Sequence, residues 1–134
     1  MKKPILAFIA GVAAWIVVAS VLNRVLRILV PGYSAAEPTF HFTLGMMAGR
    51  LSLAALASLA AGAVVAWIAP ASARTPWVLG LILLGAFVPV HVRLWNTFPI
   101  WYHLTFLLTL VPLVVLGARH VRGRAPPVVA EIGH

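Results

Sequence analysis

The chain has 134 residues, of which 63% are hydrophobic and 9% are charged, with 10 Lys and Arg against 2 Asp and Glu. Soluble domains carry about 25% charged residues on their surfaces, so this composition excludes a soluble globular domain, and it also excludes a coiled coil or a disordered chain. One integral membrane domain remains. The basic residues stand singly or in pairs between apolar runs, a distribution typical of membrane-flanking residues and not of a nucleic-acid-binding surface.

Four apolar runs without Lys, Arg, Asp or Glu follow one another along the chain, at residues 5–22, 51–68, 77–92 and 101–118. Crossing the hydrocarbon takes about 20 residues, and these runs lack the polar alternation of barrel strands. With their flanking residues they predict helices at 4–30, 38–69, 76–94 and 99–118. The expected fold class is therefore an all-α integral membrane protein, an up-and-down bundle of four transmembrane helices within residues 1–118.

The start of the first helix resembles a secretory signal sequence, because Lys2 and Lys3 precede an apolar stretch and Ser20 could lie at a cleavage site. The helical pattern nevertheless continues beyond Ser20 and stops only at Pro31. We therefore interpret the first helix as an uncleaved membrane anchor.

The distribution of basic residues predicts the orientation. With a cytoplasmic N-terminus, the inner side holds Lys2, Lys3, Arg74, Arg119, Arg122 and Arg124. The outer side then holds Arg24, Arg27, Arg50 and Arg93. The positive-inside rule favours this arrangement, and the layout is similar to that of small four-helix proteins of the bacterial inner membrane. We expect both termini in the cytoplasm, with residues 119–134 as a polar, disordered tail. The aromatic residues expected at the outer interface are Tyr33, Trp95, Trp101 and Tyr102.

The outer arginines are the main candidate binding residues. At about 1.5 Å per residue, Arg24, Arg50 and Arg93 reach nearly the same depth at the outer boundary, and Arg27 lies one turn beyond Arg24. In this interpretation the helix at 38–69 extends beyond the membrane, and Arg50 lies on the extension. Arginines at helix ends ordinarily reach lipid headgroups. If they face the bundle interior instead, they need an anion such as phosphate, a headgroup or a partner's carboxylates, because Glu37 is the only acid on that side.

Two histidines are candidate cofactor ligands. His91 and His103 lie at similar depths on neighbouring antiparallel helices, so their imidazoles could ligate haem iron or form part of a metal site. A metal usually takes three or four protein ligands. The alternative is a pair of histidines bonded to carbonyl groups that Pro89 leaves free. We assign no cofactor and no metal.

A stripe of small residues marks one face of the second predicted helix: Ala54, Ser58, Gly62 and Ala66. Small residues four apart permit close approach of membrane helices. The stripe could join copies of the chain into a homo-oligomer or a larger membrane complex, or it could pack internally against the first helix.

The absence of certain residue types argues against several classes of function. No acid lies within any apolar run, although small four-helix drug exporters depend on one. The sequence also lacks a carboxylate pair, a Ser/His/Asp set and a Gly-rich phosphate loop. The expected function is non-catalytic: an accessory or assembly subunit, or a scaffold, whose outer arginines engage anionic lipid headgroups or an acidic partner. The alternatives are a small anion transporter or channel, and a haem or metal protein that uses His91 and His103.

Overall fold

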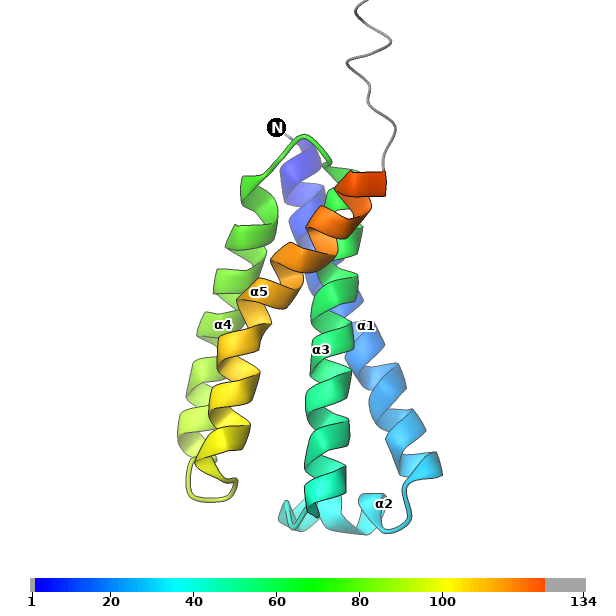
Figure 1. The fold of residues 1–134 in the computed structure, drawn as a ribbon, viewed down its shortest axis with the longest axis vertical. Helices are drawn as coiled ribbons and strands as arrows, with labels where there is room; N and C mark the ends of the chain where they lie inside the picture. The colour runs from blue at the N-terminus through cyan, green and yellow to red at the C-terminus, as the bar shows by residue number, and fades with distance from the viewer. Residues whose placement is uncertain (1, 125–134) are drawn as a thin grey trace, which may run out of the picture.

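The computed structural model describes residues 2–124, and within this range every regular element is a helix (Figure 1). The long helices are α1 (Lys2–Leu29), α3 (Leu44–Ile68), α4 (Arg74–Arg93) and α5 (Ile100–Arg124). Each of them is long and apolar enough to cross a membrane, as the sequence predicts. Two short helices, α2 (Tyr33–Ala36) and the 3-10 helix η1 (Glu37–Thr39), connect α1 to α3.

The helix bounds differ from the predicted ones by more than two residues at two places. Helix α3 begins at Leu44 and not at residue 38, because Phe40 takes a left-handed φ of 57° that ends the preceding turn. Thr43 then caps α3, and its side-chain oxygen accepts a hydrogen bond from the backbone N of Met46 at 3.2 Å. At the other end of the chain, α5 continues to Arg124, so residues 119–124 of the expected tail are helical. Residues 125–134 of that tail lie outside the described part of the chain.

Helices α3 and α5 cross in backbone contact near the end of the molecule where the N-terminus lies (Figure 1). A methyl group at Gly62 would overlap the carbonyl oxygen of Val114, and one at Gly117 would overlap that of Leu59. Toward the opposite end, where the connections 30–43 and 94–99 lie, the α4 and α5 ribbons diverge from α1 and α3. Side chains of the two helix pairs line a cleft at that end.

The small-residue stripe of α3 is buried within the chain. Gly62 packs on the backbone of α5, while Ser58 accepts a hydrogen bond from the indole N–H of Trp15 on α1 at 3.1 Å. The stripe therefore packs internally, as one of the two interpretations expects, and it contacts α5 as well as α1.

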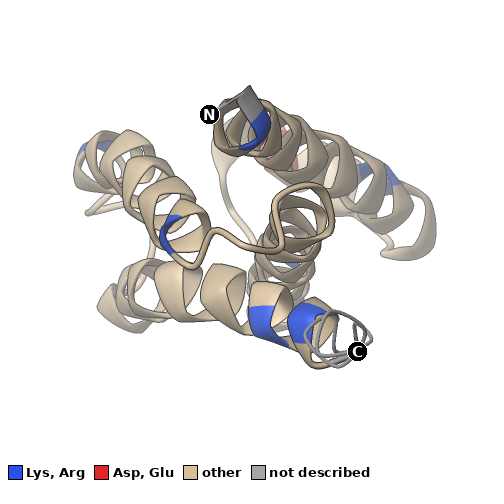
Figure 2. Ribbon diagram, turned by 90° about the horizontal axis from the view of Figure 1, so that it is seen from above, with Lys and Arg blue, Asp and Glu red and all other residues tan. Residues whose placement is uncertain are grey.

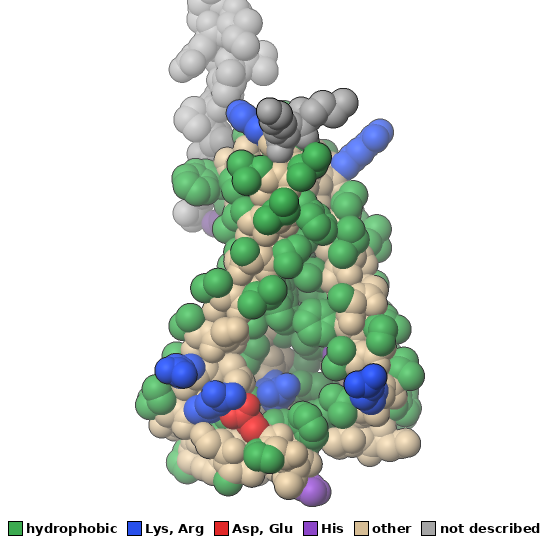
Figure 3. Space-filling model, turned by 180° about the vertical axis from the view of Figure 1, so that it is seen from behind, with side chains coloured by type: hydrophobic (Ala, Val, Ile, Leu, Met, Phe, Trp, Pro, Cys, Tyr) green, Lys and Arg blue, Asp and Glu red, His purple; other side chains and the backbone are tan. Residues whose placement is uncertain are grey.

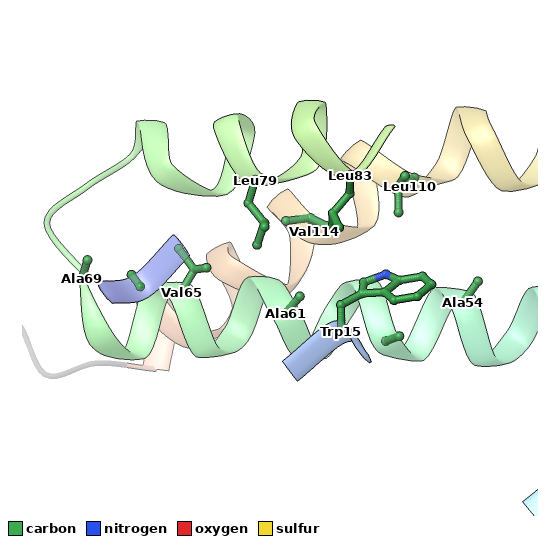
Figure 4. Close-up of a cluster of buried hydrophobic side chains, with 11 residues drawn as sticks. Trp15, Ala54, Ala61, Val65, Ala69, Leu79, Leu83, Leu110 and Val114 are labelled. Carbon is green, nitrogen blue, oxygen red and sulfur yellow. The ribbon is translucent and has the colours of Figure 1, made fainter. Parts of the chain in front are cut away.

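The hydrophobic core is formed by side chains from all four long helices (Figure 4). Leu79 and Leu83 of α4 point toward Ala61 and Val65 of α3, beside Val114 of α5. Large apolar side chains also cover the outside, where Trp67 is 78% exposed. A surface of this kind suits hydrocarbon, because water would disfavour so large an apolar area.

We expect Gly62→Ala to destabilise the protein by about 1–3 kcal/mol, because the added methyl group must push the α5 backbone away. The matched control is Gly85→Ala on α4, where an added methyl group meets no atom within 4 Å. That control should be neutral or stabilising, since alanine has a higher helix propensity than glycine. Thermal unfolding in detergent measures both variants, and equal effects would contradict the close crossing.

Candidate functional site: a polar cleft around Arg50

A cleft of about 350 Å³ opens between the α1–α3 pair and the α4–α5 pair. We call it the Arg50 cleft. Its polar lining consists of Ser20, Asn23, Glu37, Arg50 and Tyr102. Its aromatic lining consists of Trp15, Phe40, Phe42, Phe87 and Phe106. Figure 3 shows one face of the molecule hollowed between the helices, with basic side chains and an acidic one gathered toward the end opposite the N-terminus.

Among the described basic residues, Arg50 alone contributes to the lining of this cleft. Its Nε donates a hydrogen bond to the hydroxyl of Tyr102 at 3.2 Å, and its Nη1 donates to the hydroxyl of Tyr33 at 2.8 Å. Its guanidinium carbon also lies 4.7 Å from the ring centroid of Phe42, a cation–π arrangement. Within residues 2–124 no carboxylate forms an ion pair with Arg50. These neutral groups therefore orient the guanidinium without neutralising it.

Arg50 belongs to a hydrogen-bond network, the Arg50 network, whose members are Asn23, Arg27, Tyr33, Glu37, Arg50 and Tyr102. The Tyr33 hydroxyl donates to Oδ1 of Asn23 at 2.7 Å, and Nδ2 of Asn23 donates to Oε2 of Glu37 at 3.4 Å. Burial raises the pKa of the Tyr33 hydroxyl, so this group stays protonated and donates to Asn23 while it accepts from Arg50. The network joins α1, α2, η1, α3 and α5.

Glu37 is held in a bidentate ion pair with Arg27. Nε of Arg27 lies 2.6 Å from Oε1 of Glu37, and Nη2 lies 3.1 Å from Oε2. The hydrogen bond from the Arg27 guanidinium holds the pKa of Glu37 below its ordinary value of 4.5, so the group is a carboxylate at neutral pH. The pair fastens the connection 30–43 to the end of α1.

The predicted arginine layer does not converge on one site. Arg24 and Arg93 are exposed, Arg27 pairs with Glu37, and Arg50 alone lines the cleft. Seen along the helices, the Lys and Arg positions are spread over all four long helices (Figure 2). Residues at equal depth on a bundle can face different directions, and depth was the only coordinate that counting along the helices supplied.

Sequence reasoning missed the partners of Arg50. The sequence pattern assigns Tyr33 and Tyr102 only to the outer interface, and the structure shows that they are 0% and 5% exposed and bind the guanidinium. The sequence did contain a signal that Arg50 needs polar partners, because Arg50 is the only charged residue in the whole of α3. A charge inside a membrane-spanning helix needs polar partners. Counting along the helix places Arg50 at the outer boundary, where lipid headgroups can supply such partners, and partners within the chain are therefore not expected from the sequence.

The two candidate histidines do meet, as a hydrogen-bonded pair. Their Nδ1 atoms lie 2.7 Å apart, and Nε2 of His103 lies 3.3 Å from the carbonyl oxygen of Trp95. Because a carbonyl can only accept, His103 carries its proton on Nε2, and Nδ1 of His91 must donate to Nδ1 of His103. This bonding replaces the expected contact with carbonyls freed by Pro89.

Haem ligation by both histidines does not fit this arrangement, because the two rings bond directly to each other with centroids 5.0 Å apart, which leaves no room for iron between them. Within the described residues no group of three or more His, Cys, Asp or Glu is placed to hold a metal ion. The pair instead joins the end of α4 to the start of α5.

The ion pair at Glu37 makes stability depend on pH. A lowered pKa in the folded state contributes stability above the ordinary value of 4.5, and that contribution is lost as the pH falls through the folded-state value. We expect the melting temperature in detergent to fall below pH about 4.5, and Glu37→Gln to be less stable at neutral pH with a flatter acid dependence. Arg24→Gln, at an exposed position, should keep the wild-type profile. A wild-type acid slope in Glu37→Gln would contradict this account.

Comparisons of the chain with models of protein families, with curated proteins and with solved structures find no match. The function therefore has to be argued from the chemistry of the Arg50 cleft.

Proposed function

We propose that the protein is a small, non-catalytic, multi-pass membrane protein that binds the anionic group of an amphiphile, the phosphate of a lipid headgroup, in the Arg50 cleft. The observation that supports this most directly is that Arg50 lines the cleft. Within the described residues, the groups that contact its guanidinium are neutral. An accessory subunit, assembly subunit or scaffold with a structural lipid would use such a site.

The donors of Arg50 suit an oxyanion. A guanidinium has five N–H groups in a planar fork, and the two tyrosine hydroxyls occupy one on Nε and one on Nη1. The remaining donors can contact two oxygens of one phosphate, the bidentate geometry for which arginine is favoured. In surroundings of low dielectric constant this charge pairing is stronger than at a water-exposed surface.

The lining of the cleft suits a molecule with a polar head and an apolar continuation. Arg50 and Asn23 lie near one end of the cleft, whereas Trp15 bonds to Ser58, about 12 Å farther along α3. Phe87 packs on Trp15 with ring centroids 4.9 Å apart, so this deeper part is aromatic. The volume of about 350 Å³ lies within the range of roughly 300–1,000 Å³ typical of small-molecule sites. An inorganic anion alone would make no contact with the aromatic part of the cleft.

For the orientation we propose an up-and-down transmembrane bundle in a bacterial-type inner membrane, with both termini in the cytoplasm. The basic residues Lys3, Arg74 and Arg119 at the end of the molecule opposite the cleft support this, through the positive-inside rule. The Arg50 cleft then faces the outer leaflet.

We expect Arg50→Gln to weaken binding of phosphatidylglycerol to the purified protein by about tenfold or more, since a charged hydrogen-bond donor is removed. Native mass spectrometry with a titration of the lipid measures the affinity. The matched control is Arg93→Gln at the exposed last position of α4, which should bind as wild type. Because the two arginines contact different surroundings, their effects should add in the double variant.

Equal losses in the two variants would favour unspecific headgroup contacts and contradict a site at Arg50. Undiminished lipid binding by Arg50→Gln, together with loss of a co-purifying acidic protein, would replace the lipid proposal with the partner alternative.

The orientation can be tested by labelling, because the chain contains no cysteine of its own. In intact cells whose outer membrane has been made permeable, Asn96→Cys should react with a maleimide that does not cross the inner membrane. Ala71→Cys, in the exposed turn at the other end, should react only after the membrane is opened. The reverse pattern would place the Arg50 cleft in the cytoplasmic leaflet.

A further inference from the structure

We infer that the headgroup selected by the Arg50 cleft is zwitterionic: a phosphodiester with a primary ammonium group, as in phosphatidylethanolamine, with its phosphate on Arg50 and its ammonium on Glu37 beside Phe40. This inference rests on the proposed function and names the ligand class of the same site.

The cleft is lined by one group of each charge, Arg50 and Glu37, which form no ion pair with each other, although Glu37 is paired with Arg27. Arg50 and Glu37 both line it, but two neutral groups stand between them. The chain of bonds runs from Arg50 to the Tyr33 hydroxyl at 2.8 Å, from there to Asn23 at 2.7 Å, and from Asn23 to Glu37 at 3.4 Å. A ligand that carries both charges on a short linker would match both groups, whereas a purely anionic headgroup would leave the remaining acceptor site of Glu37 unused.

Glu37 keeps capacity for another donor. A carboxylate has about four lone-pair sites, and Arg27 and Asn23 occupy three of them with their hydrogen bonds. The side chain is 22% exposed, so an incoming group can reach it. The lowered pKa keeps the carboxylate charged at neutral pH. A primary ammonium can donate to the remaining site, and a trimethylammonium cannot.

Phe40 supplies an aromatic surface in the same cleft. It is the only non-glycine residue with positive φ in the described chain, and such strain persists only where neighbouring contacts hold it. Its ring packs at 6.4 Å from Phe42 and 6.0 Å from Phe98, and it lines the cleft together with Glu37. An aromatic ring and a carboxylate that line the same cleft can together bind a cation.

The test uses three lipids with identical acyl chains: phosphatidylethanolamine, phosphatidylcholine and phosphatidylglycerol. Each is titrated into delipidated full-length protein in detergent and followed by native mass spectrometry. Phosphatidylethanolamine should bind about tenfold tighter than either of the others, because only it donates a charged hydrogen bond to Glu37. In Glu37→Gln this preference should disappear, and phosphatidylglycerol should gain affinity because Arg27 becomes unpaired.

Phe40→Leu leaves the Arg27–Glu37 pair in place and provides a second variant if Glu37→Gln does not fold. It should reduce the preference for phosphatidylethanolamine over phosphatidylglycerol by a few-fold. Arg93→Gln is the control and should keep the wild-type ranking.

The outcomes separate the two proposals. If all three lipids bind equally and all depend on Arg50, the zwitterion inference is wrong and the phosphate site stands. If the preference for phosphatidylethanolamine survives both Glu37→Gln and Phe40→Leu, the assignment of the ammonium is wrong. If Arg50→Gln binds every lipid as wild type does, the proposed function itself fails.

Discussion

The close crossing of α3 and α5 at Gly62 and Gly117 is the contact on which the shape of the molecule depends. At both positions a side chain of any size would overlap a backbone carbonyl of the other helix. Helices that touch this closely at one end and cross at an angle must separate toward the other end (Figure 1). Large side chains fill the wider part, among them Trp15, Phe87 and Phe106. The same divergence that requires these aromatic residues leaves the Arg50 cleft beside them.

A partly buried charge at the wide end of the bundle needs polar neighbours from the protein, because apolar side chains offer none. Arg50 obtains them from the two tyrosines and from the face of Phe42. Its bond to Tyr102 reaches α5, and its bond to Tyr33 reaches α2, so the cation connects the two sides of the cleft. Because these partners are neutral, the arrangement retains positive charge inside the cleft, and the proposed binding of a phosphate rests on this charge.

Each side of the cleft is held together by its own polar contact. The ion pair of Arg27 with Glu37 fastens the connection 30–43 to α1. The hydrogen bond between His91 and His103 fastens α4 to α5. Nε2 of His103 also bonds to the carbonyl oxygen of Trp95, which ties the turn between these two helices to α5. At the opposite end, Arg122 donates to the carbonyl oxygen of Ser72 at 2.6 Å and joins α5 to the turn before α4. Groups that are so constrained on both sides can present Arg50 and Glu37 to a ligand with little reorganisation.

The sequence by itself determined the all-helical class of the described chain and its four long apolar helices, because hydropathy depends only on the order of residues. It also indicated that the small residues of α3 pack closely and that His91 and His103 lie at one level. Only the tertiary structure decided that Arg24 and Arg93 face outward, that Arg50 faces the cleft, and that Tyr33 and Tyr102 are its partners. The direction in which a helix face points depends on crossing angles and on where each helix begins. Bonds such as that between Arg50 and Tyr102 join residues far apart in the chain, and no local pattern encodes them.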